Sequence, residues 1–591
     1  MTYKDLPKFL EALEEKRLIK TVESEVDPVL EITEIADRIS KKYGEAIKFT
    51  NVKGSKYPLV INAMGTYERL NMGLGVENLD EIAAQIEDYM DLSAYVTLKG
   101  KIKSIPKLAP LPFIFPKKVK HAPCQEVVEE PDLDTLPIIK CWPQDGGKYI
   151  TLPLVFTKDP ENGQQNVGMY RLQVYDKKTT GMHWHLHKDG REIYEKYRKL
   201  GKRMPVSVAI GCDPATIYAA TAPLPKMIDE MIFAGYLKRR PIEIVRCLTN
   251  DIFVPANAEF ILEGYVELDE LRLEGPFGDH TGYYSLADLY PVFHLEKITH
   301  KKNPIYPTTI VGKPPMEDCY LGKATERIFL PLMKIQCPEL VDIDFPLEGV
   351  FHNCAIVSIK KAFPLHGNKI LYALWGLGQM MYTKMIIVVD DSVDVHNYGE
   401  VIQQMMLNVT RENHLIISEG PLDALDHASN RAFQGFRLGI DATTKLPLES
   451  DEKLDTNGNC SEFVFNLAKD MDTVSILKRF VAIVPHEKGG KSAFEVIRRI
   501  SDERPELRVV VLIDQWIDNR DLSTVSWKIF NNIDPERDML TFDSKSGHLV
   551  IGIDATKKGP EDGLMRPWPD DIEMSDNIKK MVDERWPKYG L

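Results

Sequence analysis

The chain has 591 residues, of which 43% are hydrophobic and 27% charged, and its formal net charge is −14 at pH 7. This length predicts several domains with ample core, and the ordinary composition excludes an intrinsically disordered chain. The acidic balance argues against a nucleic-acid partner, and no apolar run reaches the roughly 20 residues that would span a membrane.

The cysteines and the N-terminal segment both favour a cytoplasmic protein. The 8 cysteines are scattered and none forms a C-x-x-C pair, which fits reduced, buried thiols better than disulfides or a zinc ribbon. The first residues are charged and amphipathic, and they lack the apolar core of a signal peptide.

Residues 1–120 read as an α/β unit. Helical spacing places Leu6, Phe9, Leu10 and Leu13 on one face. Asp27-Pro28 is expected to start a second helix, which Gly44 ends. The buried stripe of that helix is expected to contain Val29, Ile32, Ile35, Ala36 and Ile39. A strand at 58–63 and a helix with Leu79, Ile82, Ile86 and Met90 inward are expected next.

The middle of the chain, 121–325, is predicted to be rich in strands. Seven prolines between Pro106 and Pro137 predict an irregular connection that leads into it. In the segment 260–268, apolar residues alternate with Glu263 and Glu267, which is typical of a half-buried strand with both glutamates on its polar face.

The remainder predicts two similar α/β units, 326–455 and 456–591. The apolar run Met385–Val389 is typical of a buried parallel strand, and a helix around Val401 follows. Val509–Ile513 repeats that run, and Gly439-Ile-Asp-Ala-Thr-Thr-Lys445 reappears as Gly552-Ile-Asp-Ala-Thr-Lys-Lys558. We interpret the second unit as a duplicate with a structural or oligomerisation role.

The segment Glu274-Gly-Pro-Phe-Gly-Asp279-His280 carries the first chemical signal. Gly and Pro predict a tight turn that folds both carboxylates into one cavity. Two acids in one pocket push their pKa values apart, so we expect one to stay protonated near neutral pH and to act as a general acid.

A second constellation lies upstream, in Asn166-Val-Gly-Met-Tyr-Arg171 and the histidines at 183, 185 and 187. The planar fork of Arg171 suits a substrate carboxylate. Asn166 and a histidine suit a divalent metal. The alternation of His183, His185 and His187 predicts that they share one face of a strand, where they could also form a metal cluster of their own.

These two motifs, with Thr383-Lys384 before Met385–Val389, resemble the UbiD decarboxylases, which use prenylated FMN. The resemblance runs from Asp5 to about Asn397 and resumes near Asp534–Asp538 and Trp586–Gly590. It implies a multidomain α/β and α+β protein with a central split β-barrel that holds the flavin. It also implies reversible, non-oxidative decarboxylation of an aromatic or α,β-unsaturated acid through a covalent flavin–substrate adduct.

The resemblance implies the site residues. Glu274 is the expected general acid, Asp279 the second acid and Arg171 the bridge between them. Asn166, His187 and Glu230 are expected to bind Mn²⁺ or Mg²⁺, and main-chain groups near Ala220–Ala222 to bind K⁺. The expected cofactor contacts are Thr151, Asn166, Arg171, His187, Thr221, Pro223 and Lys384.

Substrate, partners and rival functions stay open at this stage. The length and the duplicated C-terminus are similar to long members linked to menaquinone biosynthesis, which implies a naphthoate-like acid; a hydroxybenzoate-type acid is the alternative. A flavin prenyltransferase would supply the cofactor, and a homo-oligomer is expected. Outside this class, the rivals are an FMN-dependent oxidoreductase on a split barrel and a metal hydrolase built on the three histidines.

Overall fold

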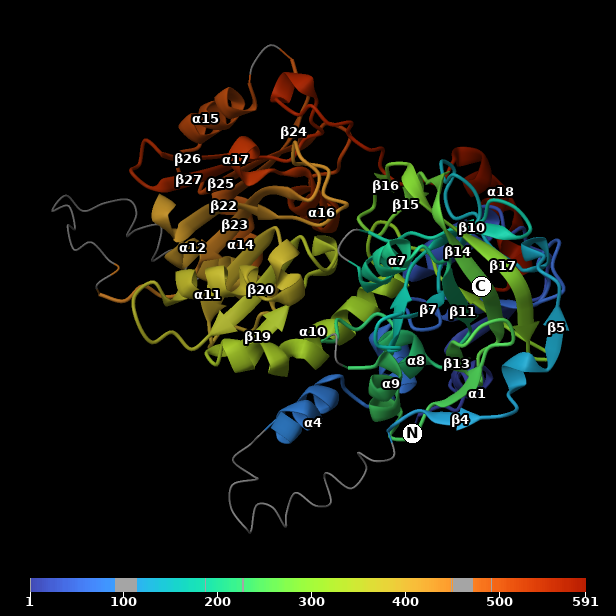
Figure 1. The fold of residues 1–591 in the computed structure, drawn as a ribbon. Helices are drawn as coiled ribbons and strands as arrows, with labels where there is room; N and C mark the ends of the chain where they lie inside the picture. The colour runs from blue at the N-terminus through green and yellow to red at the C-terminus, as the bar shows by residue number, and fades with distance from the viewer. Residues whose placement is uncertain are drawn as a thin grey trace, which may run out of the picture. The chain divides into compact units, whose positions relative to one another are not determined.

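The structure is a computed structural model that describes residues 2–90, 114–185, 188–225, 228–447, 449, 471–489 and 492–591. The chain divides into two compact units (Figure 1). The first unit contains Met1–Ile328 and Asp570–Leu591, and the second contains Phe329–Pro569. The last residues of the chain therefore belong to the same unit as the first.

A four-stranded sheet opens the first unit, in the order β1 (Ile19–Val22), β2 (Ala46–Phe49), β3 (Leu59–Ile61) and β18 (Tyr306–Thr308). Helix α1 (Leu6–Glu15) buries the four apolar residues of its predicted face, which confirms that prediction. Helices α3 (Tyr67–Leu74) and α4 (Asp80–Met90) follow β3. In α4, Ile82 is buried and the side chains of Ile86 and Met90 are only half-buried.

Helix α2 begins later than predicted. It spans Glu31–Ser40, with Leu30 rather than Asp27 at its N-cap. The Asp27 carboxylate accepts a hydrogen bond from the Val29 amide at 2.9 Å, so it closes a local turn ahead of the helix. Val29 is consequently 39% exposed and lies outside the buried stripe. At the other end, Tyr43 and not Gly44 takes the left-handed backbone conformation.

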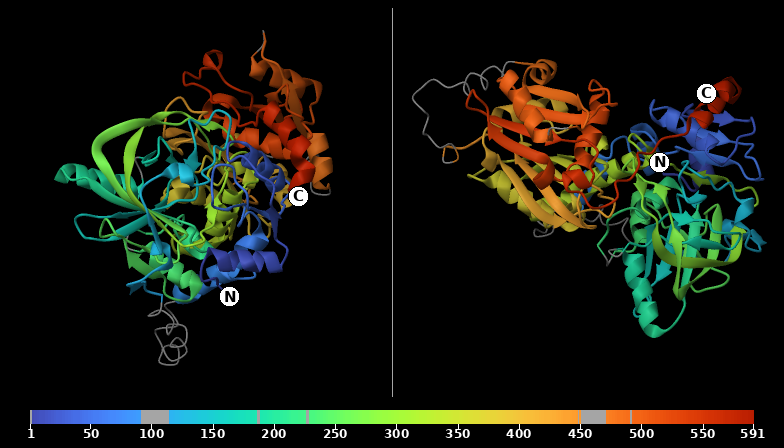
Figure 2. Two further views of the ribbon diagram at one scale, coloured as in Figure 1. Left: turned by 90° about the vertical axis from the view of Figure 1, so that its right-hand side faces the viewer. Right: turned by 90° about the horizontal axis from the view of Figure 1, so that it is seen from above.

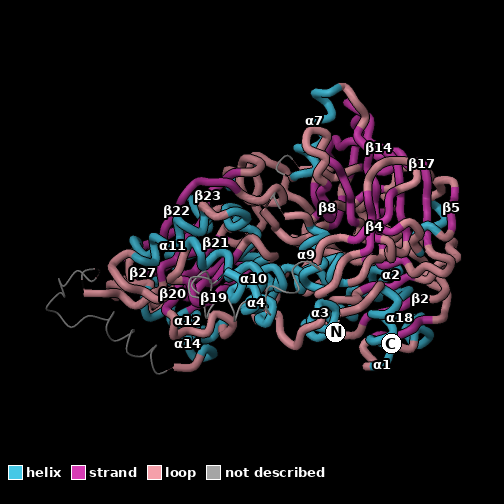
Figure 3. The backbone as a smooth tube through the Cα atoms, turned by 60° about the horizontal axis from the view of Figure 1, so that its bottom comes forward, coloured by secondary structure: helices cyan, strands magenta, loops and turns pink. Residues whose placement is uncertain are grey.

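The C-terminal helix α18 (Asp576–Tyr589) packs on α2 (Figure 3). Glu31, which is fully buried, joins the two helices. Its carboxylate accepts a hydrogen bond from the Tyr589 hydroxyl at 2.6 Å and lies 3.1 Å from the Arg585 guanidinium. A buried carboxylate is stable when it is paired and hydrogen-bonded, as Glu31 is by Tyr589 and Arg585. These contacts hold helices α2 and α18 together.

The central sheet of the first unit runs β10 (Thr179–Gly181), β17 (Asp288–His300), β14 (Phe260–Glu274), β11 (Met204–Ile210), β7 (Leu154–Lys158) and β8 (Gln165–Met169). The long, curved pair β14–β17 dominates it (Figure 2), and β5 (Val127–Glu129) adds to β17. In the part of the chain that the structure describes, no pairing joins β8 to β10. The sheet is therefore open, and the predicted split barrel is not seen.

Short elements complete the first unit. Helix α7 (Asp189–Leu200) connects β10 to β11, and helices α8 (Pro214–Ala219) and α9 (Glu230–Lys238) follow β11. Small sheets are formed by β13 (Phe253–Pro255), β12 (Glu243–Arg246) and β4 (Lys117–Val119), by β15 (Phe277–Gly278) with β16 (Tyr284–Ser285), and by β6 (Tyr149–Ile150) with β9 (Leu172–Gln173). Strands β4 and β5 lie in the segment that was predicted to be irregular, because its later prolines fall between short strands.

The second unit contains two sheets. The first runs β19 (Leu340–Asp344), β20 (Cys354–Ile359), β21 (Met385–Asp390), β23 (Gln434–Asp441) and β22 (Leu415–Pro421), and the second runs β24 (Val481–His486), β25 (Val509–Asp514), β27 (Leu549–Asp554) and β26 (Met539–Asp543). Its helices include α10 (Glu317–Gln336), which contains the boundary, α11 (His366–Trp375), α12 (Tyr398–Asn408), α14 (Thr473–Phe480), α15 (Ala493–Glu503), α16 (Leu522–Asn532) and α17 (Pro535–Asp538). The predicted strands at β21 and β25 and the helix at α12 are confirmed.

The described residues include most of the cysteines and the helices that bear on a membrane span. The seven cysteines among them are free and buried. None of the helices that the structure describes is long and apolar enough to cross a membrane.

Glu263 does not lie on a polar face of β14, as the sequence predicted, but is fully buried. Its carboxylate accepts hydrogen bonds from the amides of Leu248 at 3.0 Å and Thr249 at 2.7 Å, and from the Thr249 hydroxyl at 2.9 Å. The Glu263 carboxylate thus accepts the hydrogen bonds of two backbone amides in the loop before β13. Buried backbone amides need such an acceptor.

We expect Glu263→Gln to destabilise the protein by about 2 kcal/mol, because the amide group would turn a donor toward buried N–H groups. Glu267→Gln, in the position that sequence periodicity treats as equivalent, is the matched control and should change stability by less than about 0.5 kcal/mol. Urea denaturation measures both. Equal effects would mean that Glu263 has no special structural role.

Candidate active site

The site is built on the turn that follows β14. Glu274 is the last residue of the strand and is fully buried. Gly275 has φ +97°, a backbone conformation that glycine adopts without steric cost. Gly278 is needed for a different reason, because a Cβ there would lie 2.3 Å from the Trp142 indole ring. The motif therefore requires its glycines to bring Asp279 back toward Glu274.

A segment far upstream in the sequence holds the turn in place. The Asp145 carboxylate accepts hydrogen bonds from the amides of Gly278 and Trp142, both at 2.8 Å. The Gln173 side chain accepts one from the Gly275 amide at 2.7 Å, and the Tyr149 hydroxyl donates to the carbonyl of Pro276 at 3.2 Å. Sequence reasoning missed Asp145, although Asp145-Gly-Gly marks a turn.

Arg171 lies between β8 and β9 and binds both carboxylates. Its Nε and Nη2 donate to the two oxygens of Glu274 at 3.0 and 3.2 Å, and its Nη1 forms an ion pair with Asp279. Nη2 also donates to the Ser285 hydroxyl at 3.0 Å, a contact that the sequence did not predict. The guanidinium carbon lies 4.5 Å from the centre of the Phe277 ring. The structure thus brings together Arg171, Glu274 and Asp279, as the sequence predicted.

The charge state of the two acids differs from our expectation. Burial by itself would raise the pKa of Glu274, but the Arg171 guanidinium and His183 lower it to about 2. Burial also opposes ionisation of Asp279, yet Arg171 and His280 hold the pKa of that carboxyl well below its usual range. Both acids are ionised near neutral pH because one arginine lies between them, and the expectation that one stays protonated was wrong for this state.

The histidines are arranged differently from a metal cluster on a strand. Strand β10 ends at Gly181, so His183 and His185 follow the strand and do not lie on a face of it. His183 Nδ1 forms a hydrogen bond with Glu274 at 2.9 Å, and its Nε2 lies 2.9 Å from Nε2 of His185. Burial lowers the pKa of His183, so this ring is neutral at pH 7. His187 lies outside the described residues.

Asn166 and Glu230, two of the predicted metal ligands, lie in contact. Asn166 on β8 donates from Nδ2 to Glu230 at 2.7 Å, and the Val167 amide donates to the same carboxylate at 3.2 Å. The Oδ1 of Asn166 is buried without a hydrogen-bond partner. Burial, together with the negative charges of Asp229 and Asp189, raises the pKa of Glu230 to about 7. An orphaned amide oxygen beside clustered carboxylates fits a hard divalent cation.

The other expected cofactor contacts have local partners. The Thr151 hydroxyl lies 2.8 Å from that of Thr308 and accepts the Thr309 amide at 3.0 Å. Thr221 and Pro223 lie in the loop between α8 and α9, where the Thr221 hydroxyl donates to the carbonyl of Tyr218 at 2.7 Å. These hydrogen bonds hold Thr151 and Thr221 in position within the protein, and they do not indicate which ligand the residues bind.

Lys384 belongs to the second unit and is 1% exposed. Its ammonium forms an ion pair with Asp426 and donates to the carbonyls of Asn531 at 3.1 Å and Ile533 at 3.2 Å. These three acceptors account for the three N–H groups of a lysine. In this structure the expected phosphate contact is therefore fully engaged within the protein.

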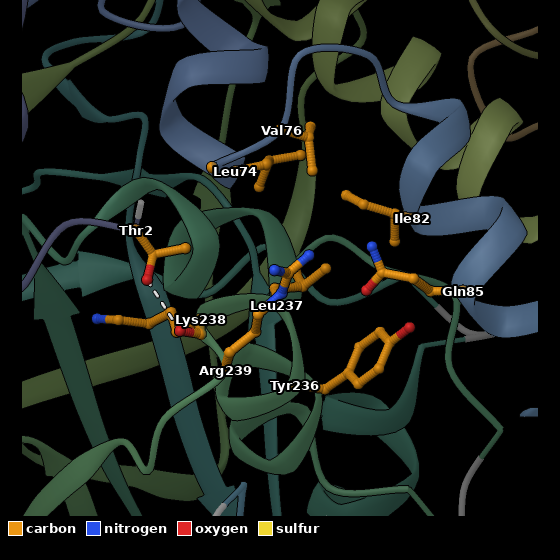
Figure 4. A pocket seen from close by; sticks show the side chains of 10 residues that line it. Thr2, Leu74, Val76, Ile82, Gln85, Tyr236, Leu237, Lys238 and Arg239 are labelled. Atoms are coloured by element: carbon orange, nitrogen blue, oxygen red, sulfur yellow. Dashed lines mark hydrogen bonds between the residues drawn. The ribbon is translucent and has the colours of Figure 1, made fainter. Parts of the chain in front are cut away.

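A pocket of about 380 Å³ lies elsewhere in the first unit, between α3, α4 and the end of α9 (Figure 4). Thr2 at its edge donates a hydrogen bond to the carbonyl of Lys238 at 2.8 Å. Its lining contains none of the residues predicted for the site. The chemistry-bearing residues therefore do not lie in this pocket.

Comparison with known families gives three matching domains. Residues 10–87, 117–314 and 319–442 with 473–554 match the N-terminal, Rift-related and C-terminal domains of 3-octaprenyl-4-hydroxybenzoate carboxy-lyase, UbiD. Together these matches cover most of the chain. The C-terminal domain matches two separate segments, one in each of the two similar parts of the second unit.

Two curated relatives illustrate how far the similarity extends. An uncharacterized protein of Archaeoglobus fulgidus is 49% identical over 455 residues, which cover 77% of this chain and 94% of the relative. One from Helicobacter pylori strain J99 is 35% identical over 601 residues, which cover 97% of this chain and 95% of the relative.

Solved structures agree with the family matches. The closed form of vanillic acid decarboxylase from Sedimentibacter hydroxybenzoicus is 28% identical, with a TM-score of 0.67, and the match covers 79% of this chain and 99% of that one. An evolved dimeric form of the UbiD-class enzyme HmfF from Pelotomaculum thermopropionicum, in complex with prFMN, is 25% identical, with a TM-score of 0.63. That match covers 75% of this chain and 96% of that one.

The depressed pKa values predict a distinct pH dependence of stability. Glu274 has a pKa of about 2 in the folded protein against an ordinary 4.5, so it stabilises the wild type above pH 4.5 and this contribution is lost as the pH falls toward 2. In Arg171→Gln the buried acids lack their partner, so their pKa values rise and the folded state binds protons.

We expect Arg171→Gln to lose about 3–5 kcal/mol at pH 8, and this deficit to shrink as the pH falls to 5. Thermal denaturation of both proteins between pH 5 and 8 measures it. A deficit that is constant across this range would show that the two carboxyls do not depend on the arginine for their charge.

Proposed function

The chain belongs to the UbiD family of carboxy-lyases, and on that premise we propose that it is a prenylated-FMN-dependent decarboxylase of an aromatic or α,β-unsaturated carboxylic acid. The observation that carries the proposal is Arg171, whose side chain is only 9% exposed and binds Glu274 and Asp279 on the turn that follows β14. The solved relatives support the cofactor and the substrate class, because one binds prFMN and another acts on vanillic acid.

When bound, prenylated FMN supplies the electron sink that lets a carbon–carboxylate bond break. The protein groups then have two tasks, to orient the acid and to protonate the carbon that loses CO₂. Arg171 suits the first task, because its fork of donors matches a carboxylate. Glu274 suits the second, because it lies within hydrogen-bond reach of both Arg171 and His183.

The low pKa of Glu274 places a condition on this mechanism, because an ionised carboxylate has no proton to give. If Arg171 turns toward the carboxylate of a substrate, its pull on Glu274 weakens, and burial then raises the pKa of the acid. Substrate binding would thus load Glu274 with a proton. Each turnover would use that proton to form the new C–H bond as CO₂ leaves, and solvent would restore it.

We propose that Asn166, Glu230 and His187 hold Mn²⁺ or Mg²⁺, and that the ion offsets the charge of the flavin phosphate. The orphaned Oδ1 of Asn166 and the raised pKa of Glu230 support a cation there. A second ion, K⁺, is proposed at the main chain of Ala220–Ala222. Thr151, Thr221 and Pro223 are kept as proposed flavin contacts on a central sheet whose closure into a split barrel is likewise proposed. Lys384 is not kept, because Asp426 engages it.

A naphthoate-like acid is our leading substrate, and a hydroxybenzoate-type acid is the alternative. The first is supported by the resemblance of the long form, with its two similar C-terminal parts, to the long family members linked to menaquinone biosynthesis. A relative in Helicobacter pylori shares this length over 97% of this chain. The similarity to vanillic acid decarboxylase supports the second. A flavin prenyltransferase would supply the cofactor, and the dimeric relative supports a homo-oligomer.

The first experiment is to co-express the chain with a flavin prenyltransferase and to analyse the released cofactor by mass spectrometry. We expect prenylated FMN, and we expect the loaded enzyme to release CO₂ from one of a panel of naphthoic and hydroxybenzoic acids. Plain FMN with NAD(P)H consumption would favour the oxidoreductase instead. No flavin in folded protein would contradict the proposal.

We expect Glu274→Gln to retain the cofactor yet to lose at least about 10²-fold in decarboxylation rate, because general acid catalysis contributes on that scale. Glu267→Gln, near the middle of the same strand, is the control and should keep wild-type turnover. Activity of Glu274→Gln within a few-fold of the wild type would exclude Glu274 as proton donor.

Removal of one metal ligand gives an independent readout. Glu230→Gln should lower the bound manganese by at least about tenfold, because a neutral amide replaces the charged ligand. Elemental analysis of purified protein measures this, with the exposed Glu161→Gln as control. An unchanged metal content would place the ion elsewhere.

A further inference from the structure

The second sheet of the second unit has the topology of four of the five strands of the first sheet, all but β19. In each, three parallel strands are followed at the edge by an antiparallel one, in the orders β20–β21–β23–β22 and β24–β25–β27–β26. The register is also the same, since Ile386 pairs with Gly439 in the first sheet as Val510 pairs with Gly552 in the second. The repeated sequence thus folds into a repeated structure.

The outer faces of the two sheets are covered in the same way. A Cβ at Gly439 would lie 2.7 Å from Leu371 of α11, and a Cβ at Gly552 would lie 2.6 Å from Ile497 of α15. In both sheets a glycine on the last parallel strand lets a helix approach closely. The similarity extends to the end of each such strand, where Asp441 and Asp554 accept hydrogen bonds from Thr443 and Thr556.

The inner faces pack on each other through equivalent residues. One hydrophobic cluster contains buried residues of β21, α12 and β23 together with those of β25, α16 and β27. The equivalent pairs in this cluster are Ile387 with Val511, Val389 with Ile513, Val401 with Val525, Val409 with Ile533, Ile440 with Ile553, and Ala442 with Ala555. Each part therefore contributes the same surface to a common core.

Two buried cations cross this interface reciprocally. Lys384, just before β21, donates to the carbonyls of Asn531 and Ile533 at the end of α16. Arg508, just before β25, donates to the carbonyl of Val409 at 2.7 Å, at the end of α12. Each part thus places a cation on the C-terminal end of the other part's helix, where carbonyls lack partners and the helix dipole favours positive charge.

Reciprocal contact between equivalent surfaces is the mark of an isologous, two-fold interface. We propose that residues 471–569 act as a partner subunit fused into the chain. They occupy the face of residues 329–449 that would otherwise be complementary to a second copy of that same part. The two carbonyl contacts of Lys384 serve this interface, so the lysine is a structural counterpart of Arg508. Its ion pair with Asp426 lies within residues 329–449.

The test compares full-length Lys384→Met and Arg508→Met with Lys545→Met, an exposed lysine of the second part. Hydrogen exchange with mass spectrometry follows β21, β25 and, as internal reference, β14. Loss of a buried charged donor should speed exchange about 10- to 100-fold. A fused two-fold interface predicts this change in both β21 and β25 for either variant, with β14 and the control unchanged.

Faster exchange confined to the strand next to the substituted residue would overturn the proposal, because the two parts would then open independently. If either variant does not fold, Lys384→Arg and Arg508→Lys keep the charge, and each should give a smaller change with the same two-strand pattern. A separate check compares the affinity of each variant for FMN with its affinity for riboflavin, which lacks the phosphate. A loss of FMN preference in Lys384→Met alone would return Lys384 to the phosphate. None of these readouts requires decarboxylase activity.

Discussion

The arginine between two buried carboxylates is the constraint on which the first unit depends. Glu274 and Asp279 carry two negative charges into a position closed to solvent, and such charges persist only when paired and hydrogen-bonded. Arg171 supplies the pairing, while the turn and its Asp145 support fix the geometry. The ion pairs that stabilise the site also keep Glu274 ionised. The proposed general acid needs a proton, so the stability of the site and its catalytic protonation state oppose each other.

Local sequence pattern predicted those elements whose partners are apolar. The face of α1 and the strands β21 and β25 were correct, since burying a continuous apolar surface depends on periodicity alone. The grouping of Arg171, Glu274 and Asp279 was also predicted, through the resemblance of short motifs. Their charge state was not, because a pKa depends on how many charges converge, and the sequence of one motif does not show that.

The remaining differences have the same origin, a partner that is distant in sequence. Glu263 has the periodicity of a surface residue but accepts hydrogen bonds from Leu248 and Thr249. Lys384, predicted from its motif to contact a phosphate, donates in this structure to carbonyls at the end of a helix far along the chain. The position of such a polar side chain depends on its hydrogen-bond partner, which in these cases lies far away in the sequence.

The contact of α18 with α2 bears on how the protein is made. The first unit is interrupted by about 240 residues of the second, so its final helix leaves the ribosome long after helix α2, on which it packs. At a synthesis rate of roughly 5–20 residues per second, that interval lasts about 10–50 s. During this interval the Glu31 carboxylate lacks its partners Tyr589 and Arg585. The early part of the first unit must therefore persist as an incomplete folding intermediate that chaperones could recognise.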